Sequence, residues 1–414
     1  MARRALVLVE ATRNTLRYVQ SAQRLGLHPI MLSADPGQYD YIAAKGIEAI
    51  RVDTDNLDAL IRECSLLRTT YDIAGITSSA ESFYATAGKL SRHFGLAGPN
   101  PASIERCCDK FIQRQLLAEA GVPGPAYRVA VNATEVERFA AEIGLPVILK
   151  PAFGMGSSGV RLCRNVDELA EYTTDLLGGK HVWLSSSKQR TWQASPRILV
   201  EEFAQGPQYN LEAMGNEVIG IAVADYGQPH FVCRGHIYPA PLTDEECARI
   251  ADISLSCLRV LGLGWGPANI ELRWTKRGPV VIEVNPRLAG SPVPEMVQLA
   301  YGVDLITEHI KLVIGKKCDL RRRHSHTVAA RYLFADRDGT LDRIDGHNRA
   351  AALSGVAEVK SFAKTKTLII RRGDAGDRIG HVIAASPSHA RAEAILQQAV
   401  DLINWSITPF PDPW

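Results

Sequence analysis

Two apolar segments joined by a polar turn place the strongest constraint on how this chain can fold. The segments are residues 269–273 and 280–287, and apolar residues alternate with polar ones throughout the first and from Ile282 onward in the second. That alternation is the period of a β-strand with one buried face. The pattern predicts an antiparallel hairpin in which Glu271 lies nearly opposite Glu283, with Asn285 on the same face as Glu283.

Carboxylates that face each other in a sheet repel, so their pairing is favourable when a cation lies between them. Glu271, Glu283 and Asn285 offer only oxygen ligands, which favours Mg²⁺, with Mn²⁺ as the alternative. Arg287 lies two residues beyond Asn285 and is expected on that same face, as a partner for a phosphate. The alternative interpretation is a solvated hairpin face on which arginine and glutamate alternate.

A glycine-rich loop follows a short apolar strand that ends at Lys150. In this loop Gly154 and Gly156 allow backbone N–H groups to approach phosphate oxygens, and the hydroxyls of Ser157 and Ser158 add donors. The loop lacks the G-x-x-x-x-G-K-[ST] pattern and is therefore not a P-loop. We predict that Lys150 and the loop bind phosphate groups. The alternative is a glycine-rich hairpin with a solvated lysine.

The segment Glu201-Glu202-Phe203 closes another apolar run. Backbone groups at a strand end can hydrogen-bond an adenine ring while an aromatic side chain packs against it. The segment is a candidate adenine site, and an acidic strand end is the alternative.

The first hundred residues alternate between apolar runs and helical patterns. The runs cover residues 5–9, 28–32 and 72–76, with helices expected at 13–25 and 80–94. This order predicts an α/β lobe with a parallel sheet. No G-x-G-x-x-G follows the first run, so we do not expect NAD to bind there by the Rossmann motif.

Beyond residue 100 the chain is expected to form two further units. A helix is predicted from Ser103 to Ala120, with the Ser103 hydroxyl as its cap, and the polar segment 178–196 is interpreted as a surface excursion. Further strands are expected at 146–150, 197–203, 217–224, 267–273, 279–284, 327–334, 356–359, 367–371 and 381–384, and helices at 244–261 and 389–404. The predicted domains are residues 1–100, 101–319 (a small lobe at about 125–203 and a central, metal-binding lobe at about 204–319) and 320–414, the last a separate α+β lobe.

Composition narrows the classes of partner. The 47 lysines and arginines nearly balance the 45 aspartates and glutamates, for a net charge of +2. We therefore expect a small-molecule substrate and no nucleic acid or membrane partner. The eight cysteines are scattered without metal spacing and are interpreted as small buried residues in a reducing compartment, and the absence of a long apolar stretch predicts a cytoplasmic protein.

Taken in order, these segments resemble the ATP-grasp superfamily. The matching segments are Asp109-Lys110 followed by Ala120-Gly121-Val122-Pro123, Lys150 with its loop, Glu201-Glu202-Phe203, and Glu271 with Glu283 and Asn285. The resemblance spans roughly residues 1–315. It implies an α/β and α+β multi-domain ATP-grasp fold with an N-terminal parallel α/β lobe and a C-terminal α+β lobe. It also implies that Lys110 and Lys150 bind the phosphates of ATP, the loop covers them, the strand end binds adenine, and the two glutamates and Asn285 hold Mg²⁺.

Within the superfamily the chain looks most like carboxylate–amine ligases of the L-amino-acid ligase type. The segments with this likeness are 235–240, 287–295, 300–305, 330–332 and 378–382. The resemblance implies that His236, Arg287, Gly290 and Ser291 contact substrate, although His236 could equally be structural. Gln208 stands where many ATP-grasp chains have a glutamate near the ribose, so an altered ribose contact is expected.

The resemblance implies an ADP-forming reaction through an acyl phosphate, with Arg287 and Lys150 as catalytic residues and two small molecules, an acid and an amine, as substrates. The expected substrates are two amino acids, or a small carboxylic acid and an amino acid, and a homodimer is compatible with the sequence. Three alternatives stay open: an ATP-grasp carboxylase, an acid–thiol ligase and a non-catalytic ATP-binding regulatory module. The sequence does not identify the base that deprotonates the amine.

Overall fold

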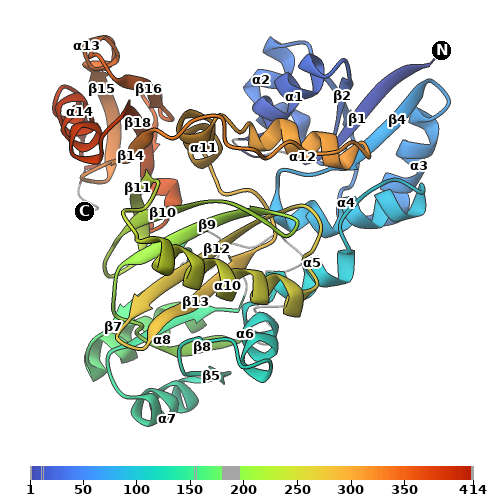
Figure 1. Ribbon diagram of the computed structural model, residues 1–414. Coiled ribbons are helices and arrows are strands. Elements are labelled where there is room, and N and C mark those ends of the chain that lie inside the picture. Colours follow the sequence, from blue (N-terminus) through green and yellow to red (C-terminus); the bar gives the residue numbers. More distant parts are fainter. Residues whose placement is uncertain are drawn as a thin grey trace.

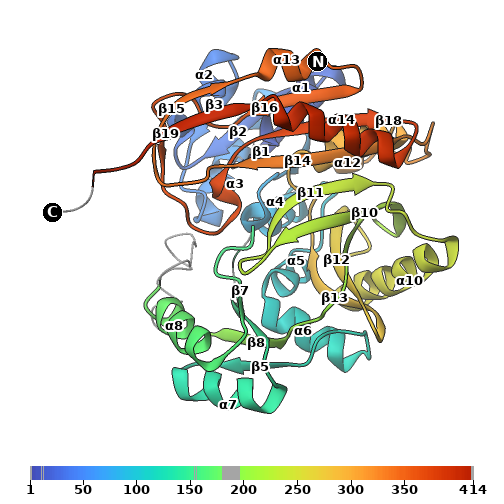
Figure 2. The same cartoon turned by 90° about the vertical axis from the view of Figure 1, so that its left-hand side faces the viewer.

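The computed structural model describes residues 2–10, 12, 14–152, 154, 156–179 and 196–411 (Figure 1). The chain folds into an N-terminal lobe, a small lobe, a central sheet and a C-terminal region. Figures 1 and 2 both place the small lobe at the opposite end of the molecule from the N- and C-terminal parts. In the described part of the chain, no helix has the length and apolar character needed to cross a membrane.

The N-terminal lobe is a parallel four-stranded sheet covered by helices, as predicted. Its elements are β1 (Arg3–Val9), α1 (Thr15–Arg24), β2 (His28–Ser33), η1 (Pro36–Gln38), α2 (Asp40–Ala44), β3 (Glu48–Arg51), α3 (Leu57–Leu67), β4 (Tyr71–Thr77) and α4 (Glu81–His93). The strand order is β3-β2-β1-β4. The apolar runs are strands buried from both sides, which explains why they lack an alternating pattern.

The single helix expected from Ser103 to Ala120 is wrong. Two helices cover this segment, α5 (Pro101–Cys108) and α6 (Lys110–Glu119). Asp109 separates them with an extended backbone, and its carboxylate caps α6 by accepting hydrogen bonds from the two amides that follow Lys110. Asn100, not Ser103, caps α5. The break makes Lys110 the first residue of a helix, which fixes where its side chain starts.

The small lobe is a four-stranded antiparallel sheet packed on two helices. Its elements are β5 (Tyr127–Ala130), α7 (Ala133–Ile143), β6 (Val147–Pro151), β7 (Arg161–Cys163), α8 (Val166–Leu177) and β8 (Ile198–Glu202), in the strand order β5-β8-β6-β7. Of the polar segment 178–196, interpreted above as a surface excursion, residues 180–195 lie outside the described residues.

The central sheet carries the predicted hairpin. The elements of this part are β9 (Gln208–Met214), β10 (Glu217–Gly227), β11 (Val232–Tyr238), α10 (Asp244–Leu261), β12 (Pro267–Thr275), β13 (Gly278–Asn285), α11 (Val293–Tyr301) and α12 (Leu305–Val313). Helices α5, α6 and α10 bury their apolar faces against β9, β12 and β13 (Figure 1). Helix α12 continues past the sheet and packs on α1, which ties the N-terminal lobe to the centre.

The C-terminal region extends the central sheet. Its elements are β14 (Thr327–Phe334), β15 (Gly339–Asp345), α13 (His347–Ala351), β16 (Val356–Ser361), β17 (Leu368–Ile369), η2 (Ala375–Asp377), β18 (Arg378–Ser386), α14 (His389–Asp401) and β19 (Asn404–Thr408). Three of its strands complete an eight-stranded sheet, β13-β12-β9-β10-β11-β14-β18-β16, while β17, β15 and β19 form a sheet of their own. The region has its own apolar core. The division at residue 320 stays a prediction, since one sheet crosses it.

The eight cysteines are all free. Five of them (Cys64, Cys107, Cys163, Cys233 and Cys257) are buried and the other three are partly buried. This agrees with their interpretation as small packing residues.

The junction between β11 and β14 gives a test of the continuous sheet. Gly235 pairs with Arg331 across this junction, and a methyl group on Gly235 would collide with the backbone carbonyl of Ala330. We expect Gly235→Ala to lower the free energy of unfolding by about 1–3 kcal/mol because backbone must move to accommodate the methyl group. Thermal unfolding measures this as a drop in Tm of several degrees. Gly264→Ala is the control, since the atom nearest to its added methyl group would be in the Asn216 side chain, at 3.8 Å. Equal Tm values for the two variants would contradict the prediction.

Candidate functional site

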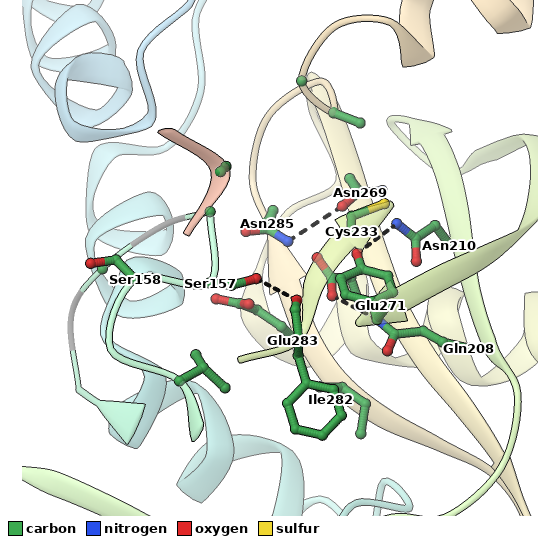
Figure 3. Close-up of a pocket in the computed structure, with 18 of the residues that line it drawn as sticks. Ser157, Ser158, Gln208, Asn210, Cys233, Asn269, Glu271, Ile282, Glu283 and Asn285 are labelled. Carbon is green, nitrogen blue, oxygen red and sulfur yellow. Dashed lines mark hydrogen bonds between the residues drawn. The ribbon is translucent and has the colours of Figure 1, made fainter. Parts of the chain in front are cut away.

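A cavity of about 540 Å³ lies where the small lobe, the central sheet, the N-terminal lobe and the C-terminal region meet (Figure 3). Every residue proposed for the site from the sequence lines it: Lys110, Lys150, Gly154, Gly156, Ser157, Ser158, Glu201, Glu202, Phe203, Gln208, His236, Glu271, Glu283, Asn285, Arg287, Gly290 and Ser291. The structure therefore brings together side chains that are up to 181 positions apart in the sequence (110 to 291). Their individual roles stay predictions.

The hairpin of β12 and β13 has the predicted register. Glu271 pairs with Glu283 and Asn269 pairs with Asn285, and these side chains gather on one side of the cavity (Figure 3). Burial and then the charge of Glu283 raise the pKa of Glu271 to about 7. Burial would also raise the pKa of Glu283, but Lys110 and Lys150 hold it below its usual value. At neutral pH Glu283 is thus charged, whereas Glu271 is about half protonated.

Each of the two predicted lysines is held by a glutamate. Lys110 Nζ lies 2.7 Å from Glu283 Oε1 and donates to the Gly154 carbonyl at 2.6 Å. Lys150 Nζ lies 2.7 Å from Glu201 Oε2. Burial would lower the pKa of Lys110, but Glu283 outweighs it and the pKa is raised. For Lys150 burial prevails over Glu201, and the pKa is lowered.

Arg114 is a buried residue that supports the site from outside the cavity and that the sequence did not reveal. Its guanidinium donates to Glu201 Oε1 at 3.0 Å and to the carbonyls of Val281 and Ile282, both at 2.6 Å. It therefore ties α6, β8 and β13 together beneath the two lysines. The available signal was its position four residues after Lys110 in a helix, which places both side chains on one face.

The glycine-rich loop is held from two sides. Ser157 has φ of 66° and its hydroxyl donates to the Phe231 carbonyl at 2.6 Å. The amide of Ala375, in the C-terminal region, donates to the Gly156 carbonyl at 3.0 Å. The loop residues Phe153 and Met155 lie outside the described residues.

The candidate adenine end of the cavity contains two phenylalanines and an arginine. The rings of Phe203 and Phe231 lie 5.7 Å apart, and the Arg273 guanidinium covers both at 5.4 and 5.2 Å. Glu202 is paired with Arg277, with both carboxylate oxygens at 2.8 Å. No sequence signal pointed to Phe231 or Arg273.

Gln208 links this end to the facing carboxylates. Its Nε2 donates to Glu271 Oε2 at 2.9 Å, and its Oε1 accepts from Arg273 Nε at 3.1 Å. An amide suits this place because it can donate to one neighbour and accept from the other. The ribose contact expected of Gln208 stays a prediction.

A chain of side-chain hydrogen bonds that starts on the neighbouring strand β9 orients Asn285. Asn269 Nδ2 donates to Glu212 Oε1 at 2.6 Å, and Asn285 Nδ2 donates to Asn269 Oδ1 at 3.4 Å. Because Glu212 Oε1 accepts from Asn269 Nδ2, the amide of Asn269 presents its Oδ1 to Asn285. Asn285 therefore turns its Nδ2 toward Asn269 and its Oδ1 away from Asn269. The sequence signal was the alternation of Gln208, Asn210 and Glu212 along β9, a strand that the sequence analysis did not predict.

Arg287 lies beside Asn285, as predicted, and has a partner from the N-terminal lobe. Its Nε donates to Glu81 Oε2 at 2.6 Å, and Nη2 donates to Asn285 Oδ1 at 3.3 Å. Burial would lower the pKa of Arg287, but Glu81 outweighs it, so the guanidinium stays charged. Glu81 begins α4, a helix that the sequence analysis did predict but to which it gave no function.

The proposed substrate residues form another wall of the cavity. His236 is buried between Asn210 and Cys233, and burial, followed by the charge of Arg378, lowers its pKa to about 3, so its ring is neutral. Ser291 Oγ donates to Glu295 at 3.0 Å, and its carbonyl accepts from the Tyr332 hydroxyl at 2.8 Å. This wall is therefore polar but carries no charge on His236.

Two family models match the chain. An ATP-grasp domain matches residues 143–295, and the L-amino acid ligase C-terminal domain 2 matches residues 331–408. The uncharacterized protein y4rH of Sinorhizobium fredii is 60% identical over 412 residues, which cover 99% of this chain and 84% of that protein. Human carnosine synthase 1 is 28% identical over 252 residues, which cover 56% of this chain and 30% of the synthase.

The fold is shared with a solved structure along nearly its whole length. The crystal structure of L-amino acid ligase from Bacillus licheniformis superposes with a TM-score of 0.80 at 20% sequence identity, covering 99% of this chain and 100% of that one. The similarity includes the C-terminal strands that extend the central sheet.

Arg114 provides a test of how the site is supported. We expect Arg114→Met to cost about 3–5 kcal/mol of folding free energy, because Glu201 then keeps a buried charge with one partner fewer and two carbonyls lose theirs. Thermal unfolding of the variant should begin well below that of the parent protein. Arg106→Met, in the exposed part of α5, is the matched control and should leave Tm nearly unchanged. A parent-like Tm for the Arg114 variant would show that this tie is dispensable.

Proposed function

This chain belongs to the ATP-grasp superfamily, as a C–N bond-forming ligase of the L-amino-acid ligase type, and we propose that it uses ATP to activate a carboxylate and joins it to an amino acid. The family matches confirm the resemblance found in the sequence. The observation that best supports the finer proposal is the convergence in one cavity of two facing glutamates, two lysines and Arg287. These are the charges needed to bind a nucleoside triphosphate together with a cation and to transfer its terminal phosphoryl group.

We propose that Glu271, Glu283 and Asn285 hold Mg²⁺, with Mn²⁺ as a substitute. The residues fit such an ion because they offer only oxygen atoms and because the charge of Glu283 opposes ionisation of Glu271, a repulsion that a cation would relieve. Among the described residues no group of three or more histidines, cysteines, aspartates and glutamates has the arrangement of a metal site. The proposed set therefore depends on the amide of Asn285. When bound, Mg²⁺ would neutralise charge on the nucleotide phosphates.

The roles of the other residues follow from their charges. Lys110 and Lys150 neutralise the phosphates, while Gly154, Gly156, Ser157 and Ser158 cover them and exclude water that would hydrolyse an acyl phosphate. Glu201, Glu202 and Phe203 lie at the adenine end, and Gln208 is the candidate ribose contact. Arg287 stabilises the charge that develops on the transferred phosphoryl group and on the acyl phosphate. His236, Gly290 and Ser291 form the substrate wall.

The main alternatives differ in the acceptor or in having no reaction. An ATP-grasp carboxylase would consume bicarbonate, an acid–thiol ligase would need a thiol, and a regulatory module would bind nucleotide without turnover. A screen of ADP and phosphate release over pairs of amino acids with Mg²⁺ separates them. We expect release that requires two amino acids together. Release with bicarbonate alone would instead identify a carboxylase, and release that requires a thiol would identify an acid–thiol ligase.

We further propose that the protein acts in the cytoplasm on small molecules without a nucleic acid or membrane partner, consistent with its nearly balanced charge. A homodimer is the proposed assembly. Light scattering of the purified chain measures the assembly directly.

Replacing Glu283 tests the proposed cation site. Glu283→Gln keeps the shape and can still accept a hydrogen bond from Lys110, but it removes one of the two carboxylates. We expect ADP release to fall by roughly 100-fold or more, with Tm within a few degrees of the parent value. Glu217→Gln, exposed at the start of β10, is the control. Near-normal turnover of the Glu283 variant would exclude this metal assignment.

The pKa of Glu271 predicts a pH dependence for nucleotide binding. With a pKa of about 7, this carboxyl is mainly protonated at pH 6 and mainly charged at pH 8. Cation binding requires the charged form, so the affinity for Mg·ADP should rise between pH 6 and 8, and binding at pH 6 should release close to one proton. Calorimetry in buffers of different ionisation enthalpy measures that proton. Glu271→Gln should abolish its release, and an identical proton count in both proteins would contradict the assignment.

A further inference from the structure

Arg378, the first residue of β18, carries a charge at the cavity that the proposed function does not use. It follows the short helix η2 and lines the cavity together with residues of that turn. One guanidinium nitrogen donates to the Cys233 carbonyl at 2.9 Å. The guanidinium carbon lies 3.6 Å from the centre of the Tyr332 ring, which holds the group flat against the cavity wall.

Within the described parts of the chain, Arg378 forms no ion pair and its Nε is buried without a hydrogen-bond partner. The aspartates of its own turn are used by backbone amides. Asp374 accepts from Gly376 at 2.6 Å, and Asp377 accepts from residues 372 and 373, both at 2.8 Å. Arg287, in the same cavity, is by contrast paired with a glutamate at 2.6 Å. A partly buried guanidinium with no anion is costly, and a cavity wall is where a ligand can supply the missing charge.

The position of Arg378 limits which group it can bind. Tyr332, on which it stacks, donates through its hydroxyl to the Ser291 carbonyl at 2.8 Å. Arg378 therefore borders the substrate wall, on a turn that also contacts the phosphate-covering loop through Ala375. The nearby His236 ring is neutral and does not compete for an anion. Under the proposed function the reacting carboxylate lies at Arg287, which leaves Arg378 available for an anionic group of the second substrate.

We propose that Arg378 binds the α-carboxylate of the amine substrate and thereby selects an amino acid over a simple amine. This inference rests on the proposed ligase function. The planar guanidinium presents two parallel N–H donors that match the two oxygens of a carboxylate. An acceptor with an α-carboxamide, or with no carboxyl group, does not offer these two oxygens. Arg378 is thus a specificity-determining residue supplied by the C-terminal region.

The test compares free and amidated acceptors. The twenty L-amino acids and their α-carboxamides are used as acceptors with the donor that gives the highest ADP release, because an α-carboxamide keeps the amine but has no α-carboxylate to bind. The parent protein, Arg378→Met, Arg378→Lys and the control Arg234→Met are measured. Arg234 is exposed on β11 and paired with Asp225. Methionine keeps an apolar body against Tyr332 but removes the charge and the N–H donors, including the one to the Cys233 carbonyl.

We expect the parent to prefer free amino acids over their carboxamides. Arg378→Met should lower kcat/KM for free amino acids by roughly 10- to 100-fold, mainly through KM, while carboxamides change by less than about threefold. For free amino acids, the kcat/KM of Arg378→Lys should lie between the values of the parent and Arg378→Met. The kcat/KM of Arg234→Met should equal that of the parent. Retained turnover of carboxamides shows that the methionine variant is folded.

Other results would overturn the inference. An equal loss for free and amidated acceptors would make Arg378 structural, and a parent protein that uses carboxamides as well as free amino acids would leave no carboxylate for it to recognise. A loss confined to acceptors with a carboxylate side chain, in both the free and the amidated form, would move the contact from the α-carboxylate to that side chain. These outcomes leave the ligase function intact, whereas a parent that releases no ADP with any pair would exclude both proposals.

Discussion

The site depends on holding two carboxylates opposite each other in a buried antiparallel hairpin. Glu271 and Glu283 face each other across β12 and β13, and of the two only Glu283 forms an ion pair with Lys110 among the described residues. Such a pair is unfavourable in an isolated hairpin. The surrounding protein compensates asymmetrically: Lys110 neutralises Glu283, and Glu271 is left with hydrogen bonds and a raised pKa. Because of this asymmetry, Glu283 is already charged, and Glu271 can lose its proton when a cation binds.

That compensation explains much of the local structure around the hairpin. Lys110 reaches Glu283 because Asp109 interrupts the chain and starts a new helix at the lysine itself. The same helix carries Arg114, which binds two carbonyls of β13 and the glutamate that holds Lys150. One short helix therefore fixes both lysines relative to the hairpin, and the break at Asp109 is part of the site.

The sequence was informative where period and spacing determine geometry. Alternation predicted the register of Glu271 with Glu283 and the side of the hairpin on which Asn285 and Arg287 lie, and the lysine before a glycine-rich loop was also found. It was less informative where tertiary contacts decide. A helical pattern runs through Asp109 without interruption, so only the buried cap shows the break. Glu212 was missed because β9 was not predicted and because its partner, Asn269, is distant in the sequence.

The C-terminal strands show why a separate lobe was predicted and what that view omitted. Their composition resembles an independent α+β unit, and they do have their own core. Strand pairing, which sequence period does not reveal, joins β14 and β18 to β11 and so to the hairpin. Arg378 and the glutamate pair thus lie on one continuous sheet, whereas Lys150 and Glu201 belong to the sheet of the small lobe. Movement of the small lobe would change the phosphate end of the cavity and leave the spacing between β13 and β18 fixed, because backbone hydrogen bonds across every intervening strand set it.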